Sequence, residues 1–589
     1  MQMLGLSIYA WITIAVILFK AAMTFSGKMS GDMLALVIIA ILILTGTLSD
    51  EQALSSFGSR TIFVVGILIV LGASMVHAGV VHWLSRKLGT PKTLRRAIAN
   101  LMLSVATMSA VFNSNTITAL FINFVKEWSK KINIPASKLL IPLSFASALG
   151  GLCTIIGSST NLLASTFYHN RTGEFMSFFA PLIPGVACII TGTLTIIVFQ
   201  KYLPERKAPE ESFESSSNYT VELLVPTECP HVGKTVSEAH LLNVTGGHLI
   251  EIVRFDKEII SPVPADEYIL GGDHLVYTGR IDDILQLRTT HKLVNATHHV
   301  FSVKELNKHR TLQLATIVPG SNLIGKCMAD INFEEENDVV LIAVAREGER
   351  ITDIPRETII YPGDTLLFEG TKMNPQNVNN DLQFFNNIAL PQQGPKTYLS
   401  LLIMLCMVIL SATSVLPLLH CTLLAAGAML ITHCCTLEQM QRAINWKIIV
   451  IFAGSVCIGK AIETTGLASA VGYSIADSFN SSPLMALFMF CLIATIATEF
   501  ISNATAAAVL IPIAIDTAEI MNVNPLTFVI ALMISISSCF ATPIGNETNT
   551  MVYGPGGYKS TDFLKLGFPM NIVILATNII VTCLVYPLK

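Results

Sequence analysis

Two short runs of small polar residues interrupt long apolar stretches of the chain: SNT at residues 114–116 and SNAT at residues 502–505. A helix broken inside a membrane exposes backbone N–H and C=O groups, so such breaks persist only where they are buried or line a polar cavity. The N-termini of half-helices offer amides and positive dipole ends to an anion. Unwound carbonyls with Ser, Thr and Asn oxygens suit Na⁺. The two runs are therefore candidate binding tips.

A second polar motif follows each tip at the same distance. GSSTN begins at Gly157 and GNETN at Gly545, and an offset of 388 residues relates both tips and both motifs. Each motif supplies further hydroxyl and amide oxygens. We expect two tips and two partner loops to converge on one site. The oxygen-bearing residues are Ser114, Asn115, Thr116, Thr118, Ser158, Ser159, Thr160 and Asn161 in the first half, and Ser502, Asn503, Thr505, Thr548 and Asn549 in the second.

The motifs lie on apolar segments long enough to cross a membrane. Hydrophobic residues make up 52% of the 589 residues and charged residues only 13%, too few charges for a soluble domain of this size. We expect a polytopic α-helical membrane protein. Its apolar segments lie near residues 5–25, 33–48, 61–83, 137–168, 177–200, 397–413, 418–433, 447–470, 525–550 and 566–587, with interrupted ones at about 97–130 and 485–517.

The membrane blocks, residues 1–200 and 395–589, read as repeats of each other. If the interrupted segments are re-entrant hairpins that do not cross, each half crosses the membrane an odd number of times. The second half then runs the opposite way. Two inverted repeats, each with a re-entrant hairpin and a broken helix, are typical of secondary transporters.

Basic residues flank the first hairpin and not the second. Residues 471–483 and 516–525, beside the second hairpin, contain no Lys or Arg. Because positively charged loops stay in the cytoplasm, we expect the first hairpin to enter from the cytoplasm and the second from outside. We therefore expect a multi-pass protein of the cell (inner) membrane, with both termini outside and residues 201–394 cytoplasmic. The basic residues beside the first hairpin are Arg86, Lys87, Lys92, Arg95, Arg96, Lys126, Lys130, Lys131 and Lys138.

Paired SNT-type tips, each followed by a GxxxN loop in two inverted halves, resemble the divalent-anion/sodium symporter (DASS) family of the ion-transporter superfamily. The resemblance covers both membrane blocks and implies a homodimeric elevator transporter with a scaffold domain and a mobile transport domain. It implies that the tips contact the acidic groups of the substrate and that each tip with its loop binds the coupling ion Na⁺. The implied substrate residues are Ser114, Asn115, Thr116, Ser502, Asn503 and Thr505. The implied Na⁺ residues are Gly157, Asn161, Thr498, Gly545 and Asn549.

The chain departs from that family's pattern at two points. Ala504 stands in the place of a threonine, so a hydroxyl is missing unless Thr505 substitutes. The loops lack the proline found in typical dicarboxylate-transporting members. A smaller tetrahedral oxyanion needs fewer and closer donors, so we favour sulfate over a four-carbon dicarboxylate.

Two carboxylates lie close to the second tip and its loop. Glu547 belongs to the GNETN loop and Glu499 precedes the second tip by three residues. Each is either a cation ligand or proton-coupling group, or a partner that fixes the loop. Because a carboxylate repels a dianion, Glu547 fits best as a Na⁺ ligand. The membrane histidines His77 and His82 fit packed or helix-end positions better than ligand positions.

The insert between the membrane blocks is a small α+β tandem. VGKT at residues 232–235 and GDHLVYTG at 272–279 recur about 91 residues later as IGKC and GDTLLFEG. The units, residues 219–290 and 306–374, resemble the TrkA C-terminal (RCK-C) regulatory domain. The resemblance implies binding of a small-molecule regulator, and a purely structural dimerisation module is the alternative. His298, His299 and Cys327 lack the spacing of a metal site.

Other classes of function fit less well. The chain has no nucleophile elbow, HExxH motif or phosphate loop of an enzyme, and its net charge of −4 gives no indication of nucleic-acid binding. No organic cofactor is expected in the membrane part, and the twelve cysteines are expected as thiols. A cation transporter is an alternative to an anion symporter, because regulatory domains of the RCK-C type often accompany cation-transport systems. A Na⁺/H⁺ antiporter is the rival by mechanism, with Glu547 as its titratable carboxylate.

Overall fold

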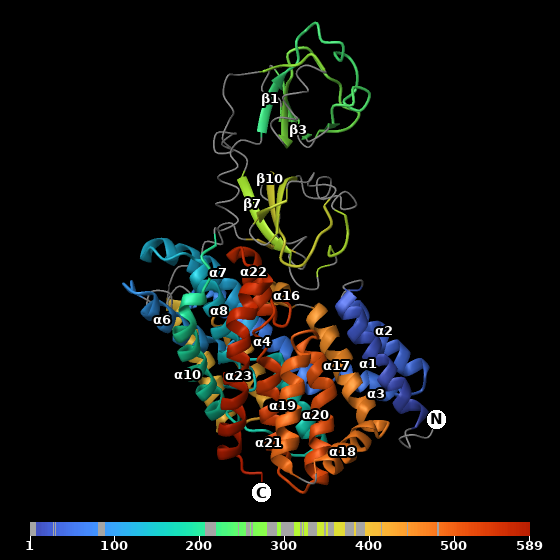
Figure 1. The fold of residues 1–589 in the computed structure, drawn as a ribbon, viewed down its shortest axis with the longest axis vertical. Helices are drawn as coiled ribbons and strands as arrows, with labels where there is room; N and C mark the ends of the chain where they lie inside the picture. The colour runs from blue at the N-terminus through green and yellow to red at the C-terminus, as the bar shows by residue number, and fades with distance from the viewer. Residues whose placement is uncertain are drawn as a thin grey trace. The chain divides into compact units, whose positions relative to one another are not determined.

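A computed structural model divides the chain into two units, one of residues 1–205, 389–553 and 558–589, and one of residues 206–388 and 554–557. The first is helical and the second is built on two small sheets (Figure 1). The structure describes residues 7–26, 29, 31–80, 89–206, 220–244, 247–254, 259–260, 263–279, 291–295, 311–317, 321, 323–327, 339–346, 349–351, 358–370, 382–384, 395–413, 415–444, 446–479 and 482–588.

Apolar helices form both halves of the helical unit. The first half contains α1 (Ile8–Ser26), α2 (Gly31–Leu44), α3 (Asp50–Phe57), α4 (Arg60–His77), α6 (Leu94–Ser109), α7 (Ser114–Ile132), α8 (Ser137–Gly151), α9 (Ser159–Thr172), α10 (Leu182–Val198) and the 3₁₀ helix η2 (Phe199–Tyr202). The second half contains α14 (Pro395–Ala412), α15 (Leu418–Ile431), α16 (Leu437–Ala443), α17 (Trp446–Thr464), α18 (Leu467–Ser478), α19 (Pro483–Ala497), α20 (Asn503–Ile520), α21 (Pro525–Ser537), α22 (Glu547–Gly556) and α23 (Ser560–Val585).

The interruptions predicted from the polar motifs coincide with helix breaks. The SNT and SNAT tips lie at the breaks α6–α7 and α19–α20. The GxxxN loops lie at the breaks α8–α9 and α21–α22. The second-half breaks are the α19–α20 and α21–α22 junctions, in orange and red in Figure 1.

Several of the described helices are long and apolar enough to cross a membrane. By length and composition there are four of them, or five if the bent pair α17–α18 counts as one span. Because α20 is among the four, length alone does not mark the second interrupted segment as re-entrant. The four are Asp50–Met75, Leu182–Tyr202, Asn503–Ile520 and Ser560–Val585, and shorter apolar helices form most other predicted segments.

The prediction of one continuous apolar segment at 447–470 is wrong. The chain bends by 67° between α17 and α18. Gly466 lies at the bend with a φ of +73°, a conformation that glycine adopts without the steric cost of a side chain. The apolar pattern continues through the bend, so hydropathy alone does not reveal it.

Helices from the two halves pack against each other. The neighbours α2 and α17, α10 and α23, and α9 and α20 each pair one helix from either half. Within the first half, α6 lies directly against α8, where a Cβ on Gly150 would stand 2.3 Å from the Ala106 carbonyl oxygen. Glycine at this contact brings the broken helix α8–α9 close to the first tip.

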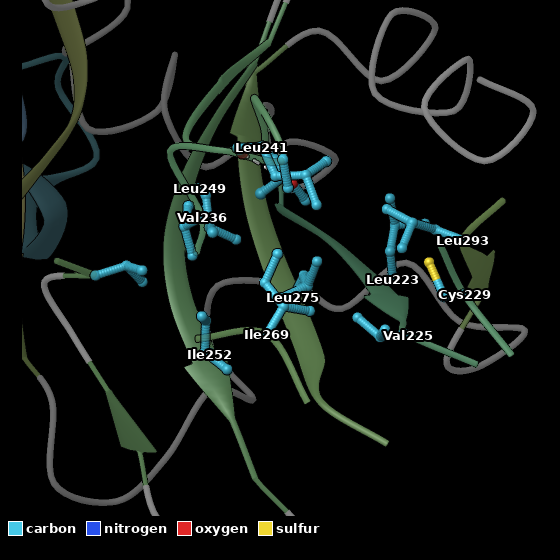
Figure 2. Close-up of a cluster of buried hydrophobic side chains, with 13 residues drawn as sticks. Leu223, Val225, Cys229, Val236, Leu241, Leu249, Ile252, Ile269, Leu275 and Leu293 are labelled. Carbon is cyan, nitrogen blue, oxygen red and sulfur yellow. Dashed lines mark hydrogen bonds between the residues drawn. The ribbon is translucent and has the colours of Figure 1, made fainter. Parts of the chain in front are cut away.

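The second unit contains two sheets with the same strand arrangement. One contains β1 (Thr220–Leu224), β2 (Asn243–Val244), β3 (Gly247–Val253), β4 (Ile259–Ile260), β5 (His274–Gly279) and β6 (Val294–Asn295), in the order β2-β3-β5-β1-β6 with β4 on β3. The other contains β7 (Thr311–Ile317), β8 (Val339–Arg346), β9 (Glu349–Arg350), β10 (Thr365–Gly370) and β11 (Leu382–Phe384), in the order β11-β7-β10-β8-β9. Leu249, Ile269 and Leu275 belong to the core of the first sheet (Figure 2).

The repeated VGKT and IGKC motifs adopt the same turn in both sheets. The N–H of Gly233 donates to the Ile269 carbonyl at 2.8 Å, and that of Gly325 donates to the Ile360 carbonyl at 2.9 Å. Both glycines have a positive φ, near +84° and +79°. The turns thus follow from the glycine that the two motifs share.

Some sequence interpretations concern residues outside the described ranges. They include parts of both predicted insert units and the residues Arg86, Lys87, His82, His298 and His299, and the side chain of His77 is likewise not described.

Candidate functional site

The first tip is a break between α6 and α7 that is capped from within. The Asn113 side chain accepts a hydrogen bond from the N–H of Asn115 at 2.9 Å, which satisfies one amide at the start of α7. Ser114 Oγ donates to the Gly157 carbonyl at 3.2 Å. Because Gly157 opens the partner loop, the first tip and the first loop are in contact, as the motif spacing predicts.

The second tip is arranged differently. The Ser502 side chain does not cap α20, and its hydroxyl lies 2.7 Å from the hydroxyl of Thr505. Asn503 is partly buried beside them. Thr505 therefore places a hydroxyl at the tip, although Ala504 leaves the family's usual position without one.

The two partner loops repeat the same hydrogen bonds at an offset of 388 residues. Asn161 Nδ2 donates to the carbonyls of Gly151 and Thr154 at 3.0 and 2.8 Å. Asn549 Nδ2 donates to the carbonyls of Cys539 and Thr542 at 3.1 and 3.0 Å. The amide groups of the two asparagines thus hold both loops in one conformation.

The glycines that open the loops lie too close to their neighbours for a side chain. A Cβ on Gly157 would stand 2.7 Å from the Gly151 carbonyl oxygen and 2.9 Å from the carbonyl oxygen of Ser109, the last residue of α6. A Cβ on Gly545 would stand 3.0 Å from a carboxylate oxygen of Glu499 and 3.1 Å from the Thr498 carbonyl oxygen. Each loop is therefore pressed against the end of its own tip, with a main-chain carbonyl beside each glycine.

Glu499 fixes the second loop. Its carboxylate accepts the N–H groups of Ala541 and Thr542 at 3.0 and 2.8 Å and the side-chain amide of Asn571 at 2.6 Å. Glu499 itself is buried. The contacts match the loop-fixing alternative for Glu499.

Glu547 joins the two halves. The side-chain amide of Asn115, in the first tip, donates to the Glu547 carboxylate. The Glu547 residue as a whole is exposed. An amide expected to meet the substrate is thus paired with an acidic group of the chain itself.

Two further predicted residues, Thr116 and Thr498, make other contacts. Thr116 lines a small apolar pocket with Gly72, Met75 and Phe112. The Thr498 hydroxyl donates back to the Ala494 carbonyl at 2.9 Å within its own helix. The sulfate- or Na⁺-binding role of every predicted residue stays a prediction.

Three contributors were missed by sequence reasoning: Ser144, Cys539 and Asn571. Ser144 Oγ lies 2.9 Å from Thr548 Oγ1 and 2.7 Å from Asn549 Oδ1. Cys539 donates to the Gly545 carbonyl at 2.9 Å. None of the three belongs to a polar motif, so only the offset of 388 residues could have drawn attention to Cys539. Among the described residues, no three His, Cys, Asp or Glu side chains gather to hold a metal ion.

Proteins similar to the chain include some named as transporters and one named for the response to sulfur deprivation. A relative named as an uncharacterized transporter in Synechocystis is 26% identical over 98% of this chain and 97% of its own. A putative sulfur deprivation response regulator of Chlamydomonas reinhardtii is 27% identical over 95% and 99%. Sodium/sulfate cotransporter 2 of the same alga is 23% identical over 63% of this chain and 43% of its own.

The citrate transporter family (CitMHS) matches residues 14–533 and 460–588, so nearly the whole chain is covered. The expectation of a transporter, and not an enzyme, is confirmed by this match and by the relatives. The helices long and apolar enough to span a membrane agree with it. The chain belongs to the citrate transporter family.

Proposed function

We propose that the protein is a Na⁺-coupled symporter of a small divalent anion, with sulfate the favoured substrate. The name of the algal relative, a sodium/sulfate cotransporter, supports both the ion and the anion. The contact between Asn115 and Glu547 carries the proposal, because it brings the first tip to the second loop. Such convergence of broken helices is what a shared anion and cation site requires.

The anion is bound by donors of the two tips. The half-helices α7 and α20 begin there, and their first amides and dipoles favour a negative charge. Tetrahedral oxyanions suit short hydroxyl and amide donors such as those of Ser502 and Asn503. The proposed anion-binding residues are Ser114, Asn115, Thr116, Ser502, Asn503 and Thr505.

Na⁺ is bound where each tip meets its loop. Carbonyls and Asn or Thr oxygens are the ligands there, and Na⁺ is a hard ion that suits oxygen. Moving a dianion into a negative interior costs about 2.3 kcal/mol per charge per 100 mV, so accompanying cations are needed. The proposed Na⁺ residues are Gly157, Asn161, Thr498, Gly545, Glu547 and Asn549.

The halves act as inverted repeats in an elevator-type homodimer. The shared hydrogen bonds of Asn161 and Asn549 support the repeat. The uneven distribution of basic residues supports the inversion, with both termini outside and residues 201–394 cytoplasmic. Within that insert, the matching order of the two sheets supports a tandem of RCK-C-like regulatory domains.

A carboxylate substrate is the second candidate. The name of the family, citrate transporter, favours a carboxylate as the substrate. A Na⁺/H⁺ antiporter is the third candidate, favoured by the titratable carboxylate of Glu547 at the contact between the two halves. Anion uptake driven by a Na⁺ gradient would indicate symport, whereas Na⁺ efflux driven by a proton gradient would indicate antiport.

Labelled-anion uptake into proteoliposomes tests the proposal. Sulfate, thiosulfate, succinate and citrate are compared in parallel, with and without an inward Na⁺ gradient. We expect sulfate uptake to rise with the gradient and to exceed uptake of the carboxylates. Failure of all four anions under both conditions would reject the symporter.

A further inference from the structure

The two tips differ in what their serines do, although the offset of 388 residues aligns Ser114 with Ser502. Ser114 is partly buried and bound to its loop, whereas Ser502 is exposed. The same offset aligns Gly151 with Cys539. Gly151 is the last residue of α8, and Cys539 holds the corresponding position before the second loop. The difference at the serines is therefore matched by a difference at this position.

In the first half, the hydroxyl of Ser114 is committed to the protein. It donates to the Gly157 carbonyl at 3.2 Å, and Ser109 Oγ lies 3.1 Å away as a further partner. A hydroxyl has one proton, so Ser114 has no second one to offer an anion while this bond persists. Its oxygen ties the tip to the loop.

Gly151 is what makes room for that bond. A Cβ at position 151 would stand 2.5 Å from Ser114 Oγ and 2.9 Å from the Gly157 carbonyl oxygen. Both distances are too short for ordinary contact. A side chain at position 151 and a serine in this orientation therefore exclude each other.

In the second half, a side chain stands at the aligned position and takes over the bond. The thiol of Cys539 donates to the Gly545 carbonyl at 2.9 Å, the acceptor aligned with Gly157. Its sulfur lies 3.5 Å from Asn503 Oδ1 in the second tip. Cys539 is fully buried, so it is held between tip and loop.

Ser502 is released as a result. Its hydroxyl contacts that of Thr505 at 2.7 Å, and either oxygen can be the donor. When Thr505 donates, the Ser502 proton is available to a ligand in the open space that this residue faces. The partner in the first half has no such freedom.

We infer that Cys539 positions the second loop in the role that Ser114 has in the first, and that Ser502 is thereby the tip serine that donates to the anion. This inference rests on the proposed function and narrows it, because it assigns the hydroxyl of Ser114 to the first loop and no longer to the anion. It makes Cys539 a positioning residue, and it makes the anion contact of the two repeats unequal.

Variants of the two serines and of Cys539 test the inference by separating anion affinity from Na⁺ response. Ser502→Ala is expected to raise the KM for sulfate about tenfold, the loss of a hydrogen bond to a charged group. Ser114→Ala is expected to raise the Na⁺ concentration for half-maximal uptake and to change the sulfate KM less than about twofold, because it loosens only the loop. Equal rises of sulfate KM in both variants would overturn the inference.

Cys539→Ala is expected to raise the half-maximal Na⁺ concentration several-fold, and Cys539→Ser to restore it, because a hydroxyl can also donate to Gly545. Cys491→Ala is the matched control, since Cys491 is equally buried but lies within α19 and belongs to neither tip nor loop. A Na⁺ response of Cys539→Ala equal to that of Cys491→Ala would also overturn the inference.

The Na⁺-induced rise of the melting temperature of the purified protein provides a readout without transport. We expect Cys539→Ala to reduce the rise and Cys491→Ala to keep it. A full rise in Cys539→Ala would overturn the inference alone. Wild-type protein with neither anion uptake nor a Na⁺-induced rise would overturn both the inference and the proposed symport.

Discussion

The loops before α9 and α22 make the same hydrogen bonds through their asparagine side-chain amide groups. The side-chain oxygens of the threonine and asparagine in each loop, however, have different surroundings in the two halves. In the second half, Thr548 Oγ1 and Asn549 Oδ1 lie within 2.9 Å of the Ser144 hydroxyl. In the first half, Thr160 Oγ1 and Asn161 Oδ1 are buried and have no hydrogen-bond partner in the described part of the chain. The protein therefore supplies a hydrogen bond to these side-chain oxygens in the second loop and supplies none in the first.

A single position accounts for this difference. The residue 388 positions after Ser144 is Leu532, which is fully buried and cannot donate a hydrogen bond. A buried oxygen without a partner costs about 1–3 kcal/mol. A bound Na⁺ would remove that cost in the first loop, whereas in the second it would compete with Ser144. We therefore expect the first loop to bind Na⁺ more tightly.

Alanine substitution of the two loop asparagines should give the largest contrast. Both variants lose the same pair of amide hydrogen bonds, and Asn549→Ala also loses the bond that Ser144 donates to its Oδ1, so Asn549→Ala should cost the loop at least as much stability. Asn161→Ala also loses an oxygen free to bind a cation, and we expect its half-maximal Na⁺ concentration to rise more than about tenfold. Asn549→Ala should raise it less than about threefold. Na⁺ titration of sulfate uptake measures both, and equal rises would remove the difference between the loops.

Glu547→Gln tests whether the halves act together. The glutamine keeps the size of the side chain and can still accept from Asn115, but it loses the negative charge in the second loop and beside the first tip. We expect a weaker Na⁺ activation, by about fivefold, from the lost attraction for a cation. Glu519→Gln, on the exposed end of α20 beside Arg171, is the control. Unchanged Na⁺ activation in Glu547→Gln would exclude this residue from coupling.

Valine substitutions of Thr160 and Thr548 should give smaller effects. The first should affect Na⁺ affinity and the second stability. Thr160→Val removes a buried hydroxyl without a partner, so we expect about a threefold loss of Na⁺ affinity without loss of stability in Na⁺-free buffer. Thr548→Val breaks the contact with Ser144 and should reduce stability by about 1 kcal/mol with little change in Na⁺ affinity. Melting temperatures with and without Na⁺ measure both. A more stable Thr160→Val with unchanged Na⁺ response would mean that its oxygen binds no cation.

The smallest expected effect is that of Ser144→Ala. It frees the oxygens of Thr548 and Asn549, so the second loop should resemble the first and bind Na⁺ about twofold more tightly. The Hill coefficient and midpoint of the Na⁺ titration report this change. A weaker Na⁺ response would instead make Ser144 itself a cation ligand.

The sequence predicted the positions of the helix breaks well because polar runs in apolar segments are rare and costly. The repeat offset also predicted that Asn161 and Asn549 correspond, as their hydrogen bonds show. It did not predict Ser144 or Cys539. Ser144 acts through contacts with Thr548 and Asn549, which lie far along the chain, and Cys539 acts through the nearby Gly545 carbonyl. A single serine or cysteine in an apolar stretch resembles any packed residue. The bend at Gly466 was missed for a related reason, since local hydropathy carries no information on helix direction.

Uptake of labelled sulfate by proteoliposomes, driven by an inward Na⁺ gradient and compared with an equal K⁺ gradient, tests the central claim most directly. We predict accumulation with Na⁺ that a Na⁺ ionophore abolishes and that Asn161→Ala shifts to higher Na⁺ concentrations. Equal sulfate uptake with Na⁺ and K⁺ would contradict Na⁺ coupling at these loops.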